Sequence, residues 1–136
     1  MRLYQILNES GRQLQPCPFP ASKIKDPLYH GTAEEFSKFL RPAHGIYVTP
    51  WEDWALDHYG NGKIIVLYAN VTKMITLDSG GYEVDAFYDM DYEEVSRMIA
   101  EWSKQGYDCC KFGGESDSMV LFNNIRIVNA ITGDEM

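Results

Sequence analysis

The feature that most constrains the fold is the run KIIVLYANVTKMITLD at residues 63–78. It is rich in β-branched residues and almost continuously apolar, which is typical of a strand buried on both faces. Asn70 interrupts the run and marks a place where a second strand can begin. The sequence therefore predicts one buried strand, and a second strand after Asn70.

The segment DYEEVSRMIAEWSKQG, residues 91–106, predicts the clearest helix. Asp91 is a suitable N-cap residue, Glu94 follows three positions later, and Gly106 ends the pattern. Apolar residues recur at i, i+3, i+4 and i+7, as expected for one buried face: Val95, Met98, Ile99 and Trp102.

Shorter elements fill the rest of the chain. A second helix is expected to begin after Thr49. Thr49 and Glu52 form a capping-box pattern, and Pro50 stands in the first turn, where proline is tolerated. EEFSKFL, residues 34–40, suits one or two helical turns. Short strands are expected at 27–31, 45–49, 107–112, 118–122 and 125–131. Strands mixed with inserted helices predict an α+β fold.

The N-terminal segment differs from the rest in its proline content. Four of the six prolines lie at positions 16, 18, 20 and 27. Proline disfavours both helices and central strands, so an extended arm is expected over residues 1–26. Residues 27–136 then form one domain, which fits a chain of 136 residues.

The net charge of −8 argues against general binding of nucleic acid, because a phosphate backbone would be repelled. A small anionic ligand is still possible, since backbone N–H groups can hold it. No apolar run is long enough to cross a bilayer, and the N-terminus lacks an apolar signal core. Three cysteines, two of them adjacent at Cys109 and Cys110, suggest reduced thiols. A cytoplasmic protein is expected, in the host cytoplasm if a phage encodes it.

Several kinds of site find no support in the sequence. The histidines are scattered at positions 30, 44 and 58, and no CxxC, HxxxH or HExxH spacing occurs, so no metal site is expected. There is no P-loop, GxGxxG or serine elbow. Cys109 and Cys110 lie in an apolar strand and are expected to be buried.

An ordered series of short motifs carries more information: LYHGT at 28–32, GIYVTP at 45–50, a helix with Ala55 and Tyr59, and GYDCC at 106–110 followed by SMVLF at 118–122. The series resembles the ADP-ribosyltransferase fold of the diphtheria-toxin and poly(ADP-ribose)-polymerase branch, in particular its small phage and bacterial domains. The resemblance covers roughly residues 27–129. It implies a transferase-like fold with a split β-sheet and a few short helices.

The resemblance also implies a function and a substrate. The function is mono-ADP-ribosylation of a macromolecular acceptor, expected to be a protein of a host or competitor. NAD+ is the substrate, and no metal is involved. His30 would bind the ribose next to adenine, and the backbone of Gly31 would hold the nicotinamide carboxamide. The same motifs assign the remaining NAD+-binding residues as Thr32, Tyr47, Ala55 and Tyr59, with a register slip from Tyr59 to His58 left open.

Two tyrosine rings suit NAD+, because aromatic faces attract the positively charged nicotinamide ring by roughly 0.5–2 kcal/mol. The family's glutamate, which begins the late strand, is replaced by Ser118 here. Serine can bind a ribose hydroxyl but supplies no negative charge. Asp117 and Glu115 are the nearest carboxylates, so the candidate catalytic set is His30, Tyr47, Ser118, Asp117 and Glu115.

Other interpretations remain open. Taken singly, a strand-end histidine, a strand tyrosine and turn carboxylates are more often structural. The absent glutamate favours a catalytically degenerate domain that binds NAD+, ADP-ribose or a protein partner. Removal of a 2′-phosphate from RNA, a reaction of relatives, is disfavoured by the net charge of −8. A structural accessory protein of a phage particle, docked through the proline-rich arm, is the fourth alternative.

Overall fold

A computed structural model describes residues 6–7, 13–32, 38–58, 63–77, 87, 89–112 and 118–136 of the chain. Two helices have their bounds within the described ranges, α1 (Glu52–His58) and α3 (Tyr92–Lys104). The strands are β1 (Ile6–Leu7), β2 (Gln13–Leu14), β3 (Leu28–Thr32), β4 (Ile46–Val48), β5 (Lys63–Ala69), β6 (Met74–Leu77), β7 (Cys109–Phe112), β8 (Met119–Leu121) and β9 (Ile127–Asn129). The α+β prediction is confirmed.

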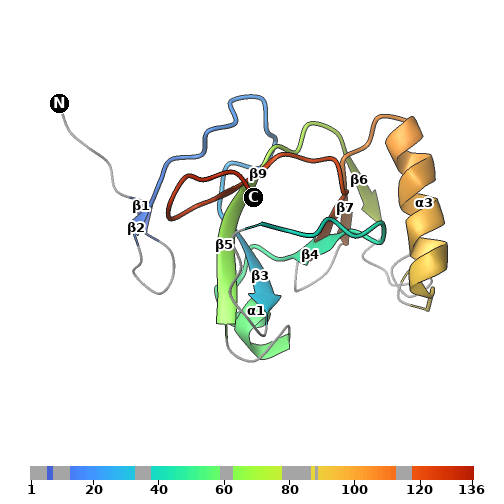
Figure 1. Ribbon diagram of the computed structural model, residues 1–136, viewed down its shortest axis with the longest axis horizontal. Coiled ribbons are helices and arrows are strands. Elements are labelled where there is room, and N and C mark those ends of the chain that lie inside the picture. The colour runs from blue at the N-terminus through green and yellow to red at the C-terminus, as the bar shows by residue number, and fades with distance from the viewer. Residues whose placement is uncertain are drawn as a thin grey trace.

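The strands form two main sheets (Figure 1). One has the order β3-β5-β9, and the other has the order β4-β8-β7-β6. The sheets meet where Tyr29 of β3 pairs with Thr49, the residue after β4. The Tyr29 N–H donates to the Thr49 carbonyl at 2.8 Å, and the Thr49 N–H donates back at 3.0 Å. Beside this bridge β3 continues along β5, while β4 continues along β8.

The apolar run at 63–78 supplies β5 and β6. β5 is the central strand of its sheet, and the consecutive residues Val66, Leu67 and Tyr68 are all buried, as a strand covered on both faces requires. β6 begins after Asn70 and pairs in parallel with β7. α3 makes the connection between these two parallel strands, which is the usual crossover element.

α3 packs along the four-stranded sheet (Figure 1). The Asp91 carboxylate accepts a hydrogen bond from the Glu94 N–H at 2.8 Å, so the predicted N-cap is present. Val95 and Ile99 are buried against the sheet. Burying each aliphatic side chain contributes about 1.5–3 kcal/mol. Gly106, with φ of 92°, follows the last turn and allows the chain to reverse.

A second apolar layer lies between the two sheets. Its residues come from both of them: Leu28, Leu67 and Ile127 from the three-stranded sheet, and Val48, Met119 and Leu121 from the four-stranded one. Alternate residues of β4 therefore face opposite layers, since Ile46 and Val48 face this one and Tyr47 packs toward α3.

The proline-rich segment packs on the domain over the part that is described. Leu14 and Phe19 are buried in a cluster with Tyr68. The Gln15 N–H donates to the Ala130 carbonyl at 2.7 Å, and the Tyr68 hydroxyl donates to the Gln15 carbonyl at 2.6 Å. Leu14 and Phe19 of this segment thus contribute to the core. The helical turn expected at 34–40 begins in residues outside the described ranges, and no helix of the described part could cross a membrane.

Candidate functional site

His30 lies on β3 just past the bridge between the sheets, and its ring is held in one orientation. Its Nδ1 is 2.8 Å from the main-chain carbonyl oxygen of Tyr47. A carbonyl oxygen only accepts, so Nδ1 carries the proton and donates it, and the neutral ring keeps Nε2 as an acceptor. Phe39 packs edge-on to the imidazole, with ring centroids 5.1 Å apart.

The surroundings of His30 also keep it uncharged. Burial lowers its pKa below the usual 6.5, and the hydrogen bond to Tyr47 opposes this only in part. His30 is therefore neutral near pH 7. An imidazole of fixed tautomer with an acceptor nitrogen suits a ligand hydroxyl or amide donor.

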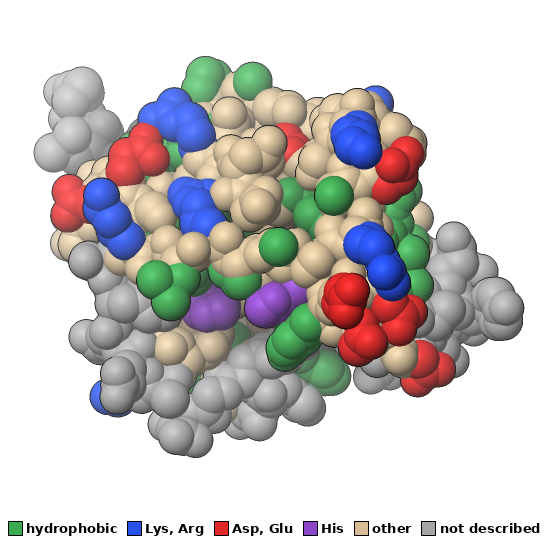
Figure 2. Space-filling view, turned by 45° about the vertical axis from the view of Figure 1, so that its right-hand side comes forward, with side chains coloured by type: hydrophobic (Ala, Val, Ile, Leu, Met, Phe, Trp, Pro, Cys, Tyr) green, Lys and Arg blue, Asp and Glu red, His purple; other side chains and the backbone are tan. Residues whose placement is uncertain are grey.

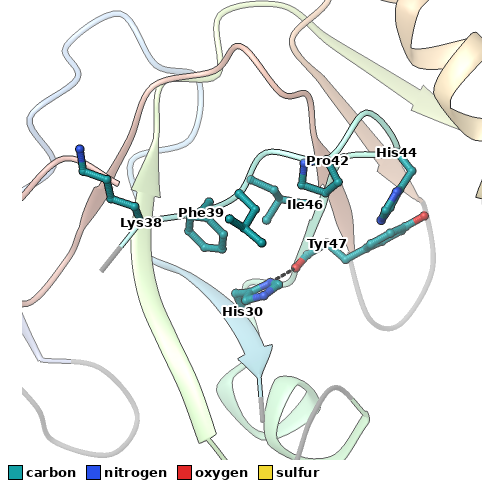
Figure 3. Close-up of a pocket in the computed structure, with 9 residues that line it drawn as sticks. His30, Lys38, Phe39, Pro42, His44, Ile46 and Tyr47 are labelled. Atoms are coloured by element: carbon teal, nitrogen blue, oxygen red, sulfur yellow. Dashed lines mark hydrogen bonds between the residues drawn. The ribbon is translucent and has the colours of Figure 1, made fainter. Parts of the chain in front are cut away.

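His30 forms part of the wall of a pocket of about 470 Å³ (Figure 3). This volume is in the range of sites for small molecules, which are typically about 300–1,000 Å³. The pocket lies between β3, the loop that leads to β4, and β4 itself. Most of its walls are apolar, and it is lined by His30, Lys38, Phe39, Leu40, Pro42, His44, Gly45, Ile46 and Tyr47.

The loop in the pocket wall is fixed to distant parts of the chain. Arg41 has a positive φ of 57°, which is uncommon for a residue with a side chain. Its guanidinium donates to the carbonyl oxygens of Asn123 and Met136, each at 3.3 Å, and to that of Ile125. Gly45 closes the loop, because its N–H donates to the Pro42 carbonyl at 3.0 Å.

Gly31 follows His30 at the place where β3 and β4 separate. In an antiparallel strand the backbone groups point alternately to either side. Tyr29 directs its N–H and C=O toward β4, so those of Gly31, two residues later, also face the β4 side. Thr32 ends the strand, and both residues are partly exposed. A planar amide fits beside such a backbone, which has no Cβ to block its approach.

Tyr47 approaches His30 through its main chain rather than through its ring. Figure 3 shows the carbonyl oxygen of Tyr47 directed at His30 and its ring extending toward His44. The ring packs on the side of the sheet that α3 covers. Tyr47 thus lines the pocket, but its aromatic face is turned away from His30.

The remaining candidates lie at different places. Ala55 is fully buried on α1 and its side chain is enclosed in the core. Ser118 is 1% exposed, and its carbonyl accepts from the Phe112 N–H at 2.8 Å. It precedes β8, next to the position that pairs with Val48, and is not among the pocket-lining residues. Tyr59, Asp117 and Glu115 fall outside the described residues, as does the side chain of His58.

Sequence reasoning missed the loop that forms most of the pocket. His44 stacks on Tyr92, the first residue of α3, with ring centroids 4.0 Å apart and ring planes 7° apart. The sequence offered only a weak signal for this loop, a histidine in the turn PAHG at residues 42–45, between the strands of the first two motifs. No group of three His, Cys, Asp or Glu side chains that could hold a metal occurs within the described ranges.

Comparison with known proteins gives one structural neighbour to report. No family model matches the chain, and no curated protein matches it. The fold is similar to that of a solved anti-CRISPR protein, with a TM-score of 0.53 and 15% sequence identity. The match covers 88% of this chain and 99% of the other. The two proteins share a fold over nearly their full lengths.

Proposed function

We propose that this protein is an NAD+-dependent mono-ADP-ribosyltransferase that modifies a protein acceptor in the cytoplasm. The observation that carries the proposal is His30, a neutral imidazole of fixed tautomer in the wall of a 470 Å³ pocket. Its Nε2 is an acceptor suited to a ribose hydroxyl, which is the role that the sequence resemblance implies.

The position of Gly31 supports the same ligand. Its N–H and C=O face the β4 side of β3, one residue from His30, although Gly31 itself is not among the pocket-lining residues. A carboxamide has one acceptor and two donors, so it can pair with both backbone groups at once. The mainly apolar pocket beside them suits the flat rings of a dinucleotide.

The transfer breaks the bond between nicotinamide and ribose C1′. The bonding electrons go to the ring nitrogen, which becomes neutral. A nucleophile of the acceptor then forms a bond to C1′ and loses its proton to solvent or a nearby base. The intermediate state resembles an oxocarbenium ion, as in glycoside transfer. His30 and Gly31 orient the substrate, and the carboxylates proposed to balance the charge are Asp117 and Glu115.

A second candidate is an ADP-ribosyltransferase-like domain that binds NAD+, ADP-ribose or a protein without catalysis. Ser118 favours it, because this residue stands where the family has a glutamate and is almost completely buried. The turned-away ring of Tyr47 also departs from a stacked pair of rings around nicotinamide.

The structural neighbour suggests which acceptors to test. Because that protein is an anti-CRISPR protein, we propose that the acceptor is a protein component of a CRISPR system. The test incubates the protein with biotinylated NAD+ and purified CRISPR effector proteins, and detects the label by blotting. Labelling of one effector protein, lost in His30→Ala and kept in Ile131→Ala, is expected.

Ile131 is a suitable control because it is 36% exposed and lies in the turn after β9, outside the pocket lining. NAD+ binding without labelling or nicotinamide release would favour the second candidate. Labelling that survives His30→Ala would remove His30 from the site.

A further inference from the structure

The pocket opens on a face where exposed apolar side chains adjoin acidic ones. Figure 2 shows two histidines close together, hydrophobic side chains next to them, and on one side a group of acidic side chains that adjoins Lys or Arg side chains. Leu40, in the pocket lining, is 98% exposed, and Tyr92 is 65% exposed. The stack of His44 on Tyr92 places the first turn of α3 beside the pocket.

The start of α3 and the residues just before it are strongly acidic. Asp89, Asp91, Glu93 and Glu94 are all exposed. Carboxylates near a helix N-terminus stabilise the helix dipole, and Asp91 caps α3, so part of the charge has a structural reason. Glu93 lies 3.8 Å from Arg97, but both side chains are largely exposed, so this pair contributes little to helix stability. Helix stability does not explain why apolar side chains are exposed beside these acids.

We propose that this face binds a basic, partly apolar segment of the protein acceptor. The docking face is defined by Leu40, Pro42, His44, Tyr92, Glu93 and Glu94. The inference rests on the proposed function, because it names the partner of the same site. It places the acceptor at the mouth of the pocket that would hold NAD+.

The chemistry of the face selects this partner. An arginine or lysine can pack its aliphatic stem on an exposed apolar side chain such as Leu40 or Tyr92, with its charge directed to a nearby carboxylate such as that of Glu93 or Glu94. Nucleic acid is disfavoured, because phosphates would meet these carboxylates. A second copy of the chain is disfavoured as well, since each copy carries a net charge of −8 and would repel the other.

The first test is an NMR titration with a 12-residue peptide of alternating arginine and leucine. A peptide with glutamate in place of arginine is the control. The largest shifts are expected at Leu40, Tyr92 and Glu94 with the arginine peptide, weakening as salt is raised. Largest shifts at another surface would overturn the proposal, and so would equal binding of both peptides.

A matched pair of variants separates the docking face from net charge. Glu94→Lys and Glu101→Lys make the same charge change on α3, and both side chains are exposed. Seven residues separate them, about 10 Å along the helix. Glu94→Lys should weaken peptide binding about 2- to 5-fold more than Glu101→Lys, as expected for the loss of one exposed ion pair. Equal weakening would show that only net charge matters.

These measurements need no NAD+, so the two proposals can fail separately. Peptide binding at the docking face without NAD+ cleavage would refute the transferase and leave the face standing. NAD+ cleavage with peptide binding elsewhere would refute the docking face alone. Thermal unfolding of Glu94→Lys shows whether the helix itself has been weakened.

Discussion

Replacing Gly45 with alanine tests whether the pocket wall is pressed directly against the four-stranded sheet. Gly45 lines the pocket and has φ of 87°, a conformation that favours glycine. An added Cβ would lie 2.3 Å from Val120 Cγ1, 3.0 Å from the Leu121 carbonyl oxygen and 3.2 Å from Ile99 Cδ1. Val120 is fully buried and stiff at χ1, so it cannot swing away.

Two costs add in this variant. The left-handed backbone costs a residue with a Cβ roughly 1–2 kcal/mol. Overpacking against a buried side chain costs about 1–3 kcal/mol more. The free energy of unfolding of Gly45→Ala should therefore fall by about 2–5 kcal/mol, a large part of the 5–15 kcal/mol typical of a small domain.

Gly133→Ala is the matched control. Its φ is 82°, but the nearest atom to an added Cβ is Gln15 Cγ at 3.8 Å, an ordinary contact. Only the backbone cost of roughly 1–2 kcal/mol applies there. Urea unfolding followed by tryptophan fluorescence measures both variants. If Gly45→Ala destabilises no more than Gly133→Ala, the wall is not packed on β8 as described.

Three further perturbations follow from the structure. NMR titration should give His30 a pKa below 6.5, because burial disfavours its charged form. The folded state then loses stability as pH falls from 6.5 through that lowered pKa, and His30→Asn should make the free energy of unfolding depend less on pH in this range. A raised pKa would contradict the burial of His30. Arg41→Ala removes the hydrogen bonds of the charged guanidinium, so it should lower the free energy of unfolding by about 1.5–3 kcal/mol. A change near zero in urea unfolding would show that Arg41 does not hold the pocket loop. Tyr68→Phe removes the hydrogen bond from the Tyr68 hydroxyl to the Gln15 carbonyl, so it should lower the free energy of unfolding by about 0.5–1.5 kcal/mol and speed hydrogen exchange of the Gln15 amide. Unchanged exchange would mean that this hydrogen bond does not hold the N-terminal segment in place.

The elements with strong local signals were predictable from sequence. The run at 63–78 is β-branched and apolar, and it forms β5 and β6. The helix at 91–106 has a cap, a periodic apolar face and a glycine stop, and it forms α3 with the expected cap. In both cases neighbouring residues alone determine the outcome.

The pocket was much less predictable, because long-range contacts build it. Its wall depends on Arg41 reaching carbonyl groups more than 80 positions away. Strand alternation indicates that Tyr47 faces away from Ile46 and Val48, but only the packing of α3 decides which face is covered. His30 was singled out through motif resemblance, whereas its tautomer follows only from the position of the Tyr47 carbonyl.

The assignment of the fold to the ADP-ribosyltransferases remains a prediction of the motif series. What the structure adds is the spatial relation of its first two motifs. LYHGT and GIYVTP become neighbouring strands, joined by the Tyr29–Thr49 bridge and by the hydrogen bond between His30 and the Tyr47 carbonyl.

Isothermal titration of NAD+ into the wild-type protein and His30→Ala tests the central claim most directly. We expect saturable binding of one NAD+ by the wild type. His30→Ala should bind about tenfold more weakly or not at all, since tenfold corresponds to about 1.4 kcal/mol, the value of one good hydrogen bond. Absence of NAD+ binding by the wild type, or equal binding by both proteins, would contradict the assignment of this pocket to NAD+.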